Sequence, residues 1–328
     1  MCLGTGVEVS PVSQHSSNLR LDVEPPSGRQ HRLALGDQEV VVTEVGATLR
    51  SYAVGGRPVI QGFGPTERAT FGMGQVLMPW PGRVGDGRYR WGGEDHQLAL
   101  DEVAMGNAIH GLVRWENWDR EASSETRLAM RHRLHARDGY PFSLELTVTF
   151  ELSEAGLAAT FSATNIGEGL APFGAGAHPY LTVGTPVVDS CRLQIPATTM
   201  LLVDDRLLPI GPAAVGATDF DFGSPRMIGS SQLNTAYTDL QRGPDGLARV
   251  VLESPEGRRL VLWLDRAHPW LLVFTGDALP AGQRRRGLAV EPMTCPPDAF
   301  RSGQDVIGLE PGRSTGGRWG IDITGFRG

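Results

Sequence analysis

Apolar and polar residues alternate with a period of two along much of the chain. From Ser143 to Leu152 the alternation is uninterrupted, with Leu144, Leu146, Val148, Phe150 and Leu152 on one face. This pattern is typical of an antiparallel strand with one buried face. The alternation resumes from Gly156 to Asn165 after a short connection. The two segments therefore predict a β-hairpin.

Eight further segments are strand candidates, and helical periodicity is nearly absent. The candidates are Glu39–Val45, Ala47–Val54, Arg127–Ala136, Cys191–Ile195, Arg249–Leu252, Arg259–Leu264, Trp270–Thr275 and Leu288–Glu291. The 43 glycines and 23 prolines would interrupt long helices and suit many strands joined by shaped loops. The sequence predicts an all-β fold, a large antiparallel β-sandwich.

The strand candidates follow one another at similar spacing, with no linker-like segment between them. We therefore expect residues 31–328 to form a single β-sandwich domain. Residues 1–30 are rich in Ser, Pro, Gln and Gly and show no periodicity. They are expected to form a flexible N-terminal tail.

Composition narrows the possible chemistry. All thirty basic side chains are arginine, which excludes Schiff-base catalysis, a pyridoxal phosphate anchor and a P-loop lysine. The net charge of −7 gives no reason to expect a nucleic acid or a membrane as partner. The three cysteines contain no C-x-x-C pair, and neither a secretory signal nor an apolar stretch of roughly 18 residues is present. We expect a cytoplasmic protein.

Two segments combine aromatic and polar residues outside the alternating pattern. Leu77–Val84 holds Trp80 and Arg83 between two prolines and a glycine, which could fix a guanidinium for hydroxyl or carboxylate recognition. Asn107–Trp118 contains His110 and Trp115, and indole rings beside polar groups suit a sugar. Taken alone, the first segment is more typical of a Pro-rich turn with a surface arginine, and a core histidine near packing tryptophans is an open alternative for the second.

Two later segments supply a histidine and a carboxylate. His178 follows two glycines and precedes Pro179, and Glu291 stands at the end of an apolar strand candidate, before Pro292. A buried carboxylate is costly unless it is paired or used in chemistry. Together His110, His178 and Glu291 could supply a proton donor, a proton acceptor and an electrostatic helper. No H-E-x-x-H, G-x-S-x-G or Walker motif suggests another chemistry.

These four segments, in this order, resemble the aldose 1-epimerase (galactose mutarotase) family over about residues 31–325. The strongest pieces are Pro79–Arg83, Ile109–Gly111, His178–Tyr180 and Glu291–Phe300, with Ala236–Leu240 as a further piece. The resemblance implies a large antiparallel β-sandwich. It also implies interconversion of the α and β anomers of a hexose such as glucose or galactose, by ring opening and closure.

The resemblance also implies roles for individual residues. Glu291 would be the general base, His178 the general acid and His110 a second histidine that orients the sugar. Arg83 and Asp239 would bind sugar hydroxyls, and the indoles of Trp80 and Trp115 are further candidates for substrate contact. Members of the family often carry Asn before this arginine, whereas Gly82 stands here. No metal or other cofactor is expected, the partner is a small sugar, and the protein is expected to be a monomer or homodimer.

Two other functions remain open from the sequence. A hexose-6-phosphate 1-epimerase would keep the acid and the base and add arginines near the sugar's C6, for which Arg88, Arg285 and Arg286 are candidates. A non-catalytic carbohydrate-binding β-sandwich would keep the aromatic residues and Arg83. It would not need His178 and Glu291 together.

Overall fold

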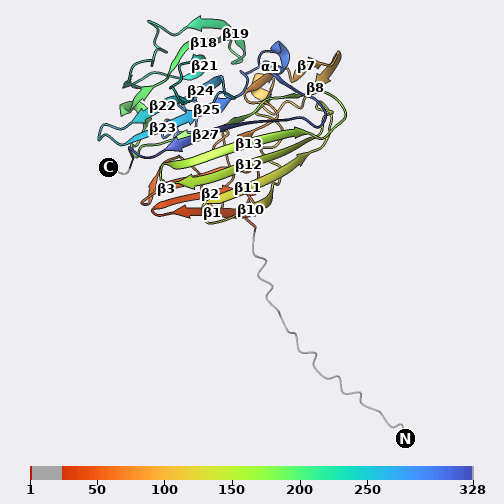
Figure 1. Ribbon diagram of the computed structural model, residues 1–328, viewed down its shortest axis with the longest axis horizontal. Helices are drawn as coiled ribbons and strands as arrows, with labels where there is room; N and C mark the ends of the chain where they lie inside the picture. The colour runs from red at the N-terminus through yellow and green to blue at the C-terminus, as the bar shows by residue number, and fades with distance from the viewer. Residues whose placement is uncertain (2–23, 327–328) are drawn as a thin grey trace.

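The computed structural model describes residues 1 and 24–326, and its regular secondary structure is almost entirely β-strand (Figure 1). Most of the predicted N-terminal tail, residues 2–23, lies outside the described residues. Contacts with the fold begin before residue 31, because Ser27 is buried and the Arg29 guanidinium lies 2.8 Å from the Glu44 carboxylate. The prediction of an all-β fold is confirmed.

The larger of two main sheets has nine strands, and every neighbouring pair in it is antiparallel. In order across the sheet these are β10 (Asp119–Ser123), β11 (Arg127–Leu134), β12 (Leu144–Ser153), β13 (Gly156–Asn165), β27 (Ser314–Asp322), β23 (Arg259–Leu264), β22 (Ala248–Glu253), β17 (Arg192–Gln194) and β20 (Arg226–Met227). The predicted hairpin is β12 and β13, paired from Leu144 opposite Asn165 to Ser153 opposite Gly156.

The second main sheet has eight strands and is also antiparallel. Its order is β19 (Pro209–Ala214), β18 (Ala197–Val203), β21 (Asn234–Leu240), β24 (Trp270–Phe274), β25 (Leu288–Met293), β15 (Gly176–Ala177) and β5 (Val76–Leu77), with β16 (Tyr180–Leu181) also paired to β25. Each of the ten predicted strand segments overlaps a strand of the structure. The short strands that flank His178 and the strand that carries Glu291 lie in this second sheet.

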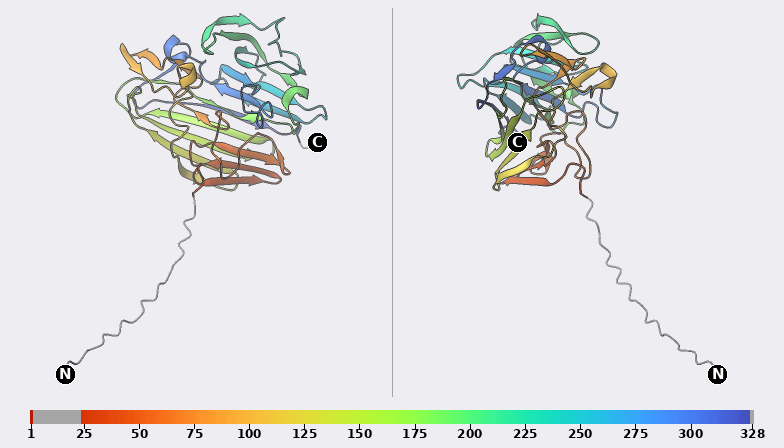
Figure 2. Two further views of the ribbon diagram at one scale, coloured as in Figure 1. Left: turned by 180° about the vertical axis from the view of Figure 1, so that it is seen from behind. Right: turned by 90° about the vertical axis from the view of Figure 1, so that its right-hand side faces the viewer.

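Smaller sheets and short helices complete the fold. They are the sheet β1 (Gln30–Leu35), β2 (Gln38–Thr43), β3 (Leu49–Val54) and β4 (Arg57–Pro58), the pairs β6 (Arg83–Gly85) with β9 (Asn107–Ile109), β7 (Arg88–Trp91) with β8 (Glu94–Gln97) and β14 (Ala171–Phe173) with β26 (Ile307–Leu309), the 3₁₀ turns η1 (Val103–Met105) and η2 (Val188–Ser190), and the helix α1 (Ala299–Ser302). Strand β1 packs beside β11 and β12 (Figure 2).

One cluster of buried apolar side chains joins the two main sheets. Leu146 and Phe150 of β12 belong to it, and so do Val273 of β24 and Val290 of β25. These side chains are 0–1% exposed. The alternation that predicted β12 therefore points its apolar face into the shared core, where burial stabilises the fold.

The eight-stranded sheet is buried on both faces around β25. Val290 faces the main core, whereas Ala289 and Met293 join two smaller apolar clusters on the other face. Successive side chains of a strand alternate between faces, so Glu291 shares the second face. This explains why the segment reads as a continuous apolar run with one carboxylate in it.

Among residues 24–326, no helix combines the length and the apolar character that crossing a bilayer would require.

Candidate active site

Strand β25 brings His178 beside Glu291. Short strands on either side of the His178–Pro179 step both pair with β25, with Gly176 opposite Met293 and Tyr180 opposite Ala289. The Pro179 carbonyl between them accepts a hydrogen bond from the Val290 N–H at 3.1 Å. Strand β25 continues past Glu291 through Pro292 to Met293, so the carboxylate sits inside the strand and not at its end.

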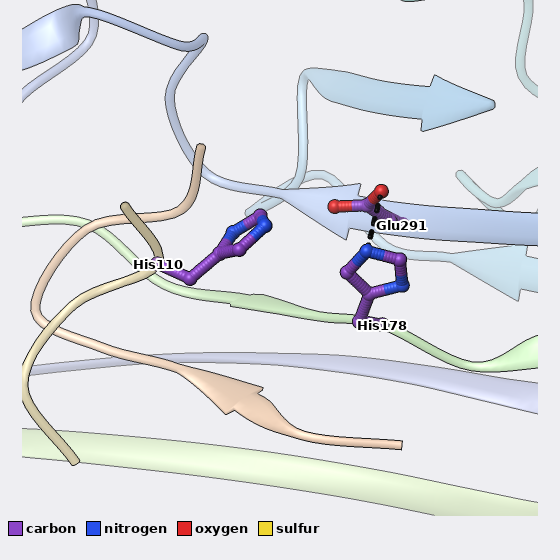
Figure 3. A group of neighbouring side chains, drawn as sticks. All are labelled: His110, His178 and Glu291. Atoms are coloured by element: carbon purple, nitrogen blue, oxygen red, sulfur yellow. Dashed lines mark ion pairs between the residues drawn. The ribbon is translucent and has the colours of Figure 1, made fainter. Parts of the chain in front are cut away.

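The His178 and Glu291 side chains form a buried pair. His178 Nε2 lies 3.1 Å from Glu291 Oε1, and the two side chains are 5% and 2% exposed (Figure 3). His178 Nδ1 and Glu291 Oε2 are buried and have no hydrogen-bond partner among the described residues. Unsatisfied buried polar atoms are rare in folded proteins, and they suit a site that exchanges hydrogen bonds with a ligand.

Burial shifts both pKa values toward the uncharged forms. It raises the pKa of Glu291 to about 8, and the positive charge of Arg83 opposes this shift. Burial also lowers the pKa of His178 to about 3. At neutral pH the pair therefore holds a single proton, and a group that can donate a proton lies beside one that can accept it. Such shifted pKa values are common at catalytic sites.

The ring of His178 is held in place by its neighbours. The ring of Tyr180 stacks on it, with centroids 4.9 Å apart and planes at 9°, and the Tyr180 hydroxyl donates to the Phe71 carbonyl at 2.9 Å. Gly72 packs on the same histidine so closely that a Cβ at this position would lie 2.4 Å from His178 Cδ2. Only glycine fits there, and its φ of +75° also favours glycine.

His110 completes the group drawn in Figure 3. It follows β9 with a left-handed backbone (φ 62°), and its ring centroid lies 5.4 Å from that of His178. The Gly82 N–H donates to His110 Nδ1 at 3.1 Å. Burial, followed by the nearby His178, lowers the pKa of His110 well below its usual value. The neutral ring therefore carries its proton on Nε2, where it can donate a hydrogen bond.

The three side chains line a cavity of about 490 Å³. Polar groups of the wall include Arg83, Asp101, Glu102, Arg114 and Asn234, and apolar groups include Phe71, Met105, Leu207, Leu272, Phe274 and Leu279. This volume and mixture of groups are typical of small-molecule sites. The structure brings His110, His178, Glu291 and Arg83 together, as the sequence predicted for a single site.

Arg83 reaches the cavity despite the glycine before it. Gly82 adopts a left-handed backbone, with φ of +67°, and lies against Pro297. The Arg83 guanidinium donates from Nε and Nη2 to the two carboxylate oxygens of Glu102, both at 2.8 Å. The guanidinium is therefore fixed at the wall by a bidentate ion pair.

A family comparison agrees with this geometry. The profile of the family described as aldose 1-epimerase matches residues 30–321. The chain belongs to the aldose 1-epimerase family. This confirms the resemblance carried by the four motif segments.

Relatives cover most of the chain. "Uncharacterized protein YihR" of Escherichia coli (strain K12) is 33% identical over 88% of this chain and 91% of its own length. The "Maltose epimerase" of Levilactobacillus brevis is 25% identical over 79% of this chain and 83% of its own. The solved structure of galactose 1-epimerase from Lactobacillus acidophilus NCFM superimposes with a TM-score of 0.74 at 24% identity, covering 89% of this chain and 94% of the other. This last likeness shows that the fold is shared.

Within this family member, Asp239 does not lie at the cavity. Asp239 is exposed near the C-terminal end of β21, where its carboxylate accepts a hydrogen bond from the Thr199 hydroxyl at 2.5 Å. Asn234 opens the same strand and lines the cavity instead. Asp239 stands five positions after Asn234 along the extended strand, which corresponds to roughly 17 Å, so the two side chains cannot both reach one sugar.

The two tryptophans proposed for substrate contact are not among the residues that line the cavity. Trp80 is buried, 2% exposed, and packs against Phe300 with ring centroids 5.4 Å apart. Trp115 is 48% exposed and lies beside the guanidinium of Arg114. Trp80 thus serves as a packing group, and the aromatic side chains at the wall include Phe71 and Phe274, which the sequence motifs did not indicate.

The three arginines considered for a phosphate lie elsewhere. Arg285 is bound to Asp189 and Asp277, both at 2.7 Å. Arg88 donates to Gln97 at 3.0 Å, and Arg286 lines a separate surface cleft. None of them lines the cavity that holds Glu291.

The three side chains drawn in Figure 3 also have the composition of a metal site. His110, His178 and Glu291 each offer one ligand atom, and the three atoms lie within 4.8 Å of one another. Two histidines and a glutamate are a donor set that zinc takes in some enzymes. A metal ion here would have to displace the hydrogen bond between His178 and Glu291. Cofactor-free chemistry therefore stays a prediction, which chelation can test.

Proposed function

We propose that this protein is an aldose 1-epimerase that interconverts the α and β anomers of a hexose such as glucose or galactose by general acid and base catalysis. The observation that carries the proposal is the buried His178–Glu291 pair, with 3.1 Å between Nε2 and Oε1, in a cavity of about 490 Å³. Membership of the aldose 1-epimerase family supports the same reaction class.

Ring opening needs two proton transfers at neighbouring oxygens. Starting from the form in which the shared proton has moved to His178, Glu291 takes the proton of the C1 hydroxyl while His178 gives its proton to the ring oxygen, and the bond between C1 and the ring oxygen breaks to leave an aldehyde. After rotation about the C1–C2 bond, His178 takes the proton from the C5 hydroxyl and Glu291 returns its own to the new C1 hydroxyl. The pair ends the cycle with the single proton with which it began.

The environment of the pair suits this exchange. Burial disfavours the carboxylate–imidazolium form, whereas the positive charge of Arg83 favours the carboxylate. At neutral pH the shared proton therefore rests on Glu291, and it passes across the 3.1 Å hydrogen bond to His178 before ring opening. His110, neutral and with its Nε2 proton free to donate, would hold a sugar oxygen beside the reacting atoms.

The two alternatives from the sequence receive less support. A hexose-6-phosphate epimerase would use Arg88, Arg285 or Arg286, and none of these lines the cavity. A binding module has no use for a desolvated carboxylate beside a histidine, because burying such a pair costs stability that only chemistry would justify.

Polarimetry on freshly dissolved α-D-glucose, α-D-galactose and maltose tests the proposal directly. Maltose is included because one relative is named maltose epimerase. Glu291→Gln and His178→Asn should each slow the approach to anomeric equilibrium by about 10²- to 10⁴-fold. His135→Asn, a change at an exposed histidine outside the cavity, should leave the rate unchanged. Purified protein that accelerates none of these sugars would overturn the proposal.

A further inference from the structure

Each of the two arginines that line the cavity is matched by a neighbouring carboxylate. Arg83 makes the bidentate pair with Glu102, and Arg114 Nη2 donates to Asp101 Oδ2 at 2.6 Å. The arginine side chains are 13% and 11% exposed. Asp101 and Glu102 are consecutive in the chain, so one short segment neutralises the positive charges of both arginines.

The two carboxylates are held by further hydrogen bonds. Glu102 Oε2 also accepts from Asn107 Nδ2 at 2.9 Å, and Asp101 Oδ1 accepts from the Ile109 N–H at 2.8 Å. The backbones of Glu102 and Asn107 exchange two hydrogen bonds, at 3.0 and 3.3 Å. These acids are therefore fixed parts of the wall and do not swing freely on the surface.

The result is a cavity wall without net charge. Two guanidinium groups and two carboxylates line it, and the remaining ionisable groups are the uncharged His110, the pair that shares one proton and Tyr180, whose phenol pKa burial raises. In a partly desolvated cavity, an unmatched charge interacts far more strongly than in water. An uncharged sugar meets balanced dipoles there, whereas an anionic sugar meets two carboxylates that already occupy the arginines.

We propose that Asp101 and Glu102 determine specificity: by neutralising Arg114 and Arg83 they restrict the site to uncharged aldoses and exclude sugars that carry a phosphate or another anionic group. The inference rests on the proposed mutarotase function and names the substrate class of the same site. The discrimination arises from charge: each guanidinium is already paired with a carboxylate, so an anionic sugar meets no net positive charge at the wall.

Amide variants of the two acids test the inference. Asp101→Asn, Glu102→Gln and the double variant keep the shape of the side chains and a carbonyl oxygen that can accept from arginine, but they remove the negative charges. The rates of anomer exchange are measured by NMR for α-D-glucose and for α-D-glucose 6-phosphate. Binding of inorganic phosphate is measured in parallel by calorimetry, which does not depend on catalysis.

Wild type should favour free glucose over glucose 6-phosphate in kcat/KM by at least about 100-fold, which corresponds to roughly 2.7 kcal/mol. The double variant should gain about tenfold or more toward glucose 6-phosphate and should bind phosphate, and both gains should shrink as salt concentration rises. A purely structural role of the two acids would produce no such salt-dependent gain. Glu39→Gln is the matched control, because it breaks an exposed ion pair in which Arg32 Nε and Nη2 both donate to Glu39 Oε2, and it should change neither selectivity nor phosphate binding.

The possible failures are distinct. Wild-type protein that accelerates neither sugar overturns the proposed function. In that case the difference in phosphate binding between wild type and the amide variants still tests the charge of the cavity wall. Wild-type protein that uses both sugars equally well overturns the inference, and so do folded variants that gain neither phosphate binding nor turnover of glucose 6-phosphate. Circular dichroism establishes folding, and the single variants carry the test if the double variant does not fold.

Discussion

His178 and Glu291 lie side by side across two paired strands, with 3.1 Å between Nε2 and Oε1, and both are almost completely removed from solvent. The distance is that of a hydrogen bond, so the pair can pass one proton between its members. A substrate that inserts its own oxygens there replaces this hydrogen bond by two new ones.

The first prediction concerns pH. The proposed reaction needs one proton on the pair, and the pKa of Glu291 is raised to about 8 while that of His178 is lowered to about 3. Activity should therefore stay level through the neutral range and fall as pH rises through about 8, where Glu291 loses the shared proton. The pH profile of kcat/KM, corrected for the spontaneous reaction, measures this. A loss of activity on acidification near pH 6.5 would instead indicate a histidine with an ordinary pKa.

The second prediction concerns Tyr180, whose ring stacks on His178. We expect Tyr180 to be a positioning residue that stops the imidazole from rotating away from Glu291. Tyr180→Leu should lower kcat by about ten- to a hundredfold with little change in KM, because misplacing a proton donor affects the chemical step most. Tyr180→Phe keeps the ring and should restore most of kcat. Equal losses in both variants would instead assign the effect to the hydroxyl that donates to Phe71.

The third prediction separates two residues of β21. Asn234 lines the cavity, and none of its side-chain atoms hydrogen-bonds to another described residue, so it is free to bind a sugar hydroxyl. Asn234→Ala should raise KM about three- to tenfold, the effect of losing one ordinary hydrogen bond. Asp239→Ala, at the other end of the same strand, should leave KM unchanged. The reverse outcome would restore Asp239 as the sugar-binding residue.

The fourth prediction concerns metal ions. Proton transfer by His178 and Glu291 needs no Lewis acid, so treatment with EDTA followed by dialysis should leave the mutarotation rate unchanged. The same preparation supplemented with Zn²⁺ should lose activity, because the ion would occupy the ligand atoms of His110, His178 and Glu291. Loss of activity with EDTA and its recovery with zinc would identify a metalloenzyme.

The sequence predicted those parts of the fold in which local pattern and tertiary environment agree. Strands β12 and β13 alternate strictly because one face of each contacts the core. Strand β27 was not predicted, although it lies in the centre of the nine-stranded sheet. Its glycines conceal the alternation, and packing requires them, since a Cβ on Gly320 would lie 2.4 Å from Trp263 Cζ2.

Site residues that stand in a sequence motif could be predicted. Site residues that reach the cavity only through the pairing of distant segments could not be predicted. His110, His178 and Glu291 stand in segments that break the strand pattern, and the structure brings all three to one cavity. Nothing in the sequence around Asn234 tells which end of β21 reaches this cavity, because strand order and register determine it. The pairing of Glu102 with Arg83 is likewise a long-range contact without a local signature.

Because β25 is buried on both faces, its two faces have different tasks in this protein. Val290 faces the core and Glu291 the cavity, so the backbone that carries the proposed general base is anchored by the packing of the main core. Asp101, Glu102 and His110, in contrast, stand on loops beside short strands. Variation that changes which sugar is accepted is therefore expected to accumulate in these loops, while the position of the proton acceptor stays constant. The fold can therefore accept a different sugar while the residues proposed for proton transfer stay the same.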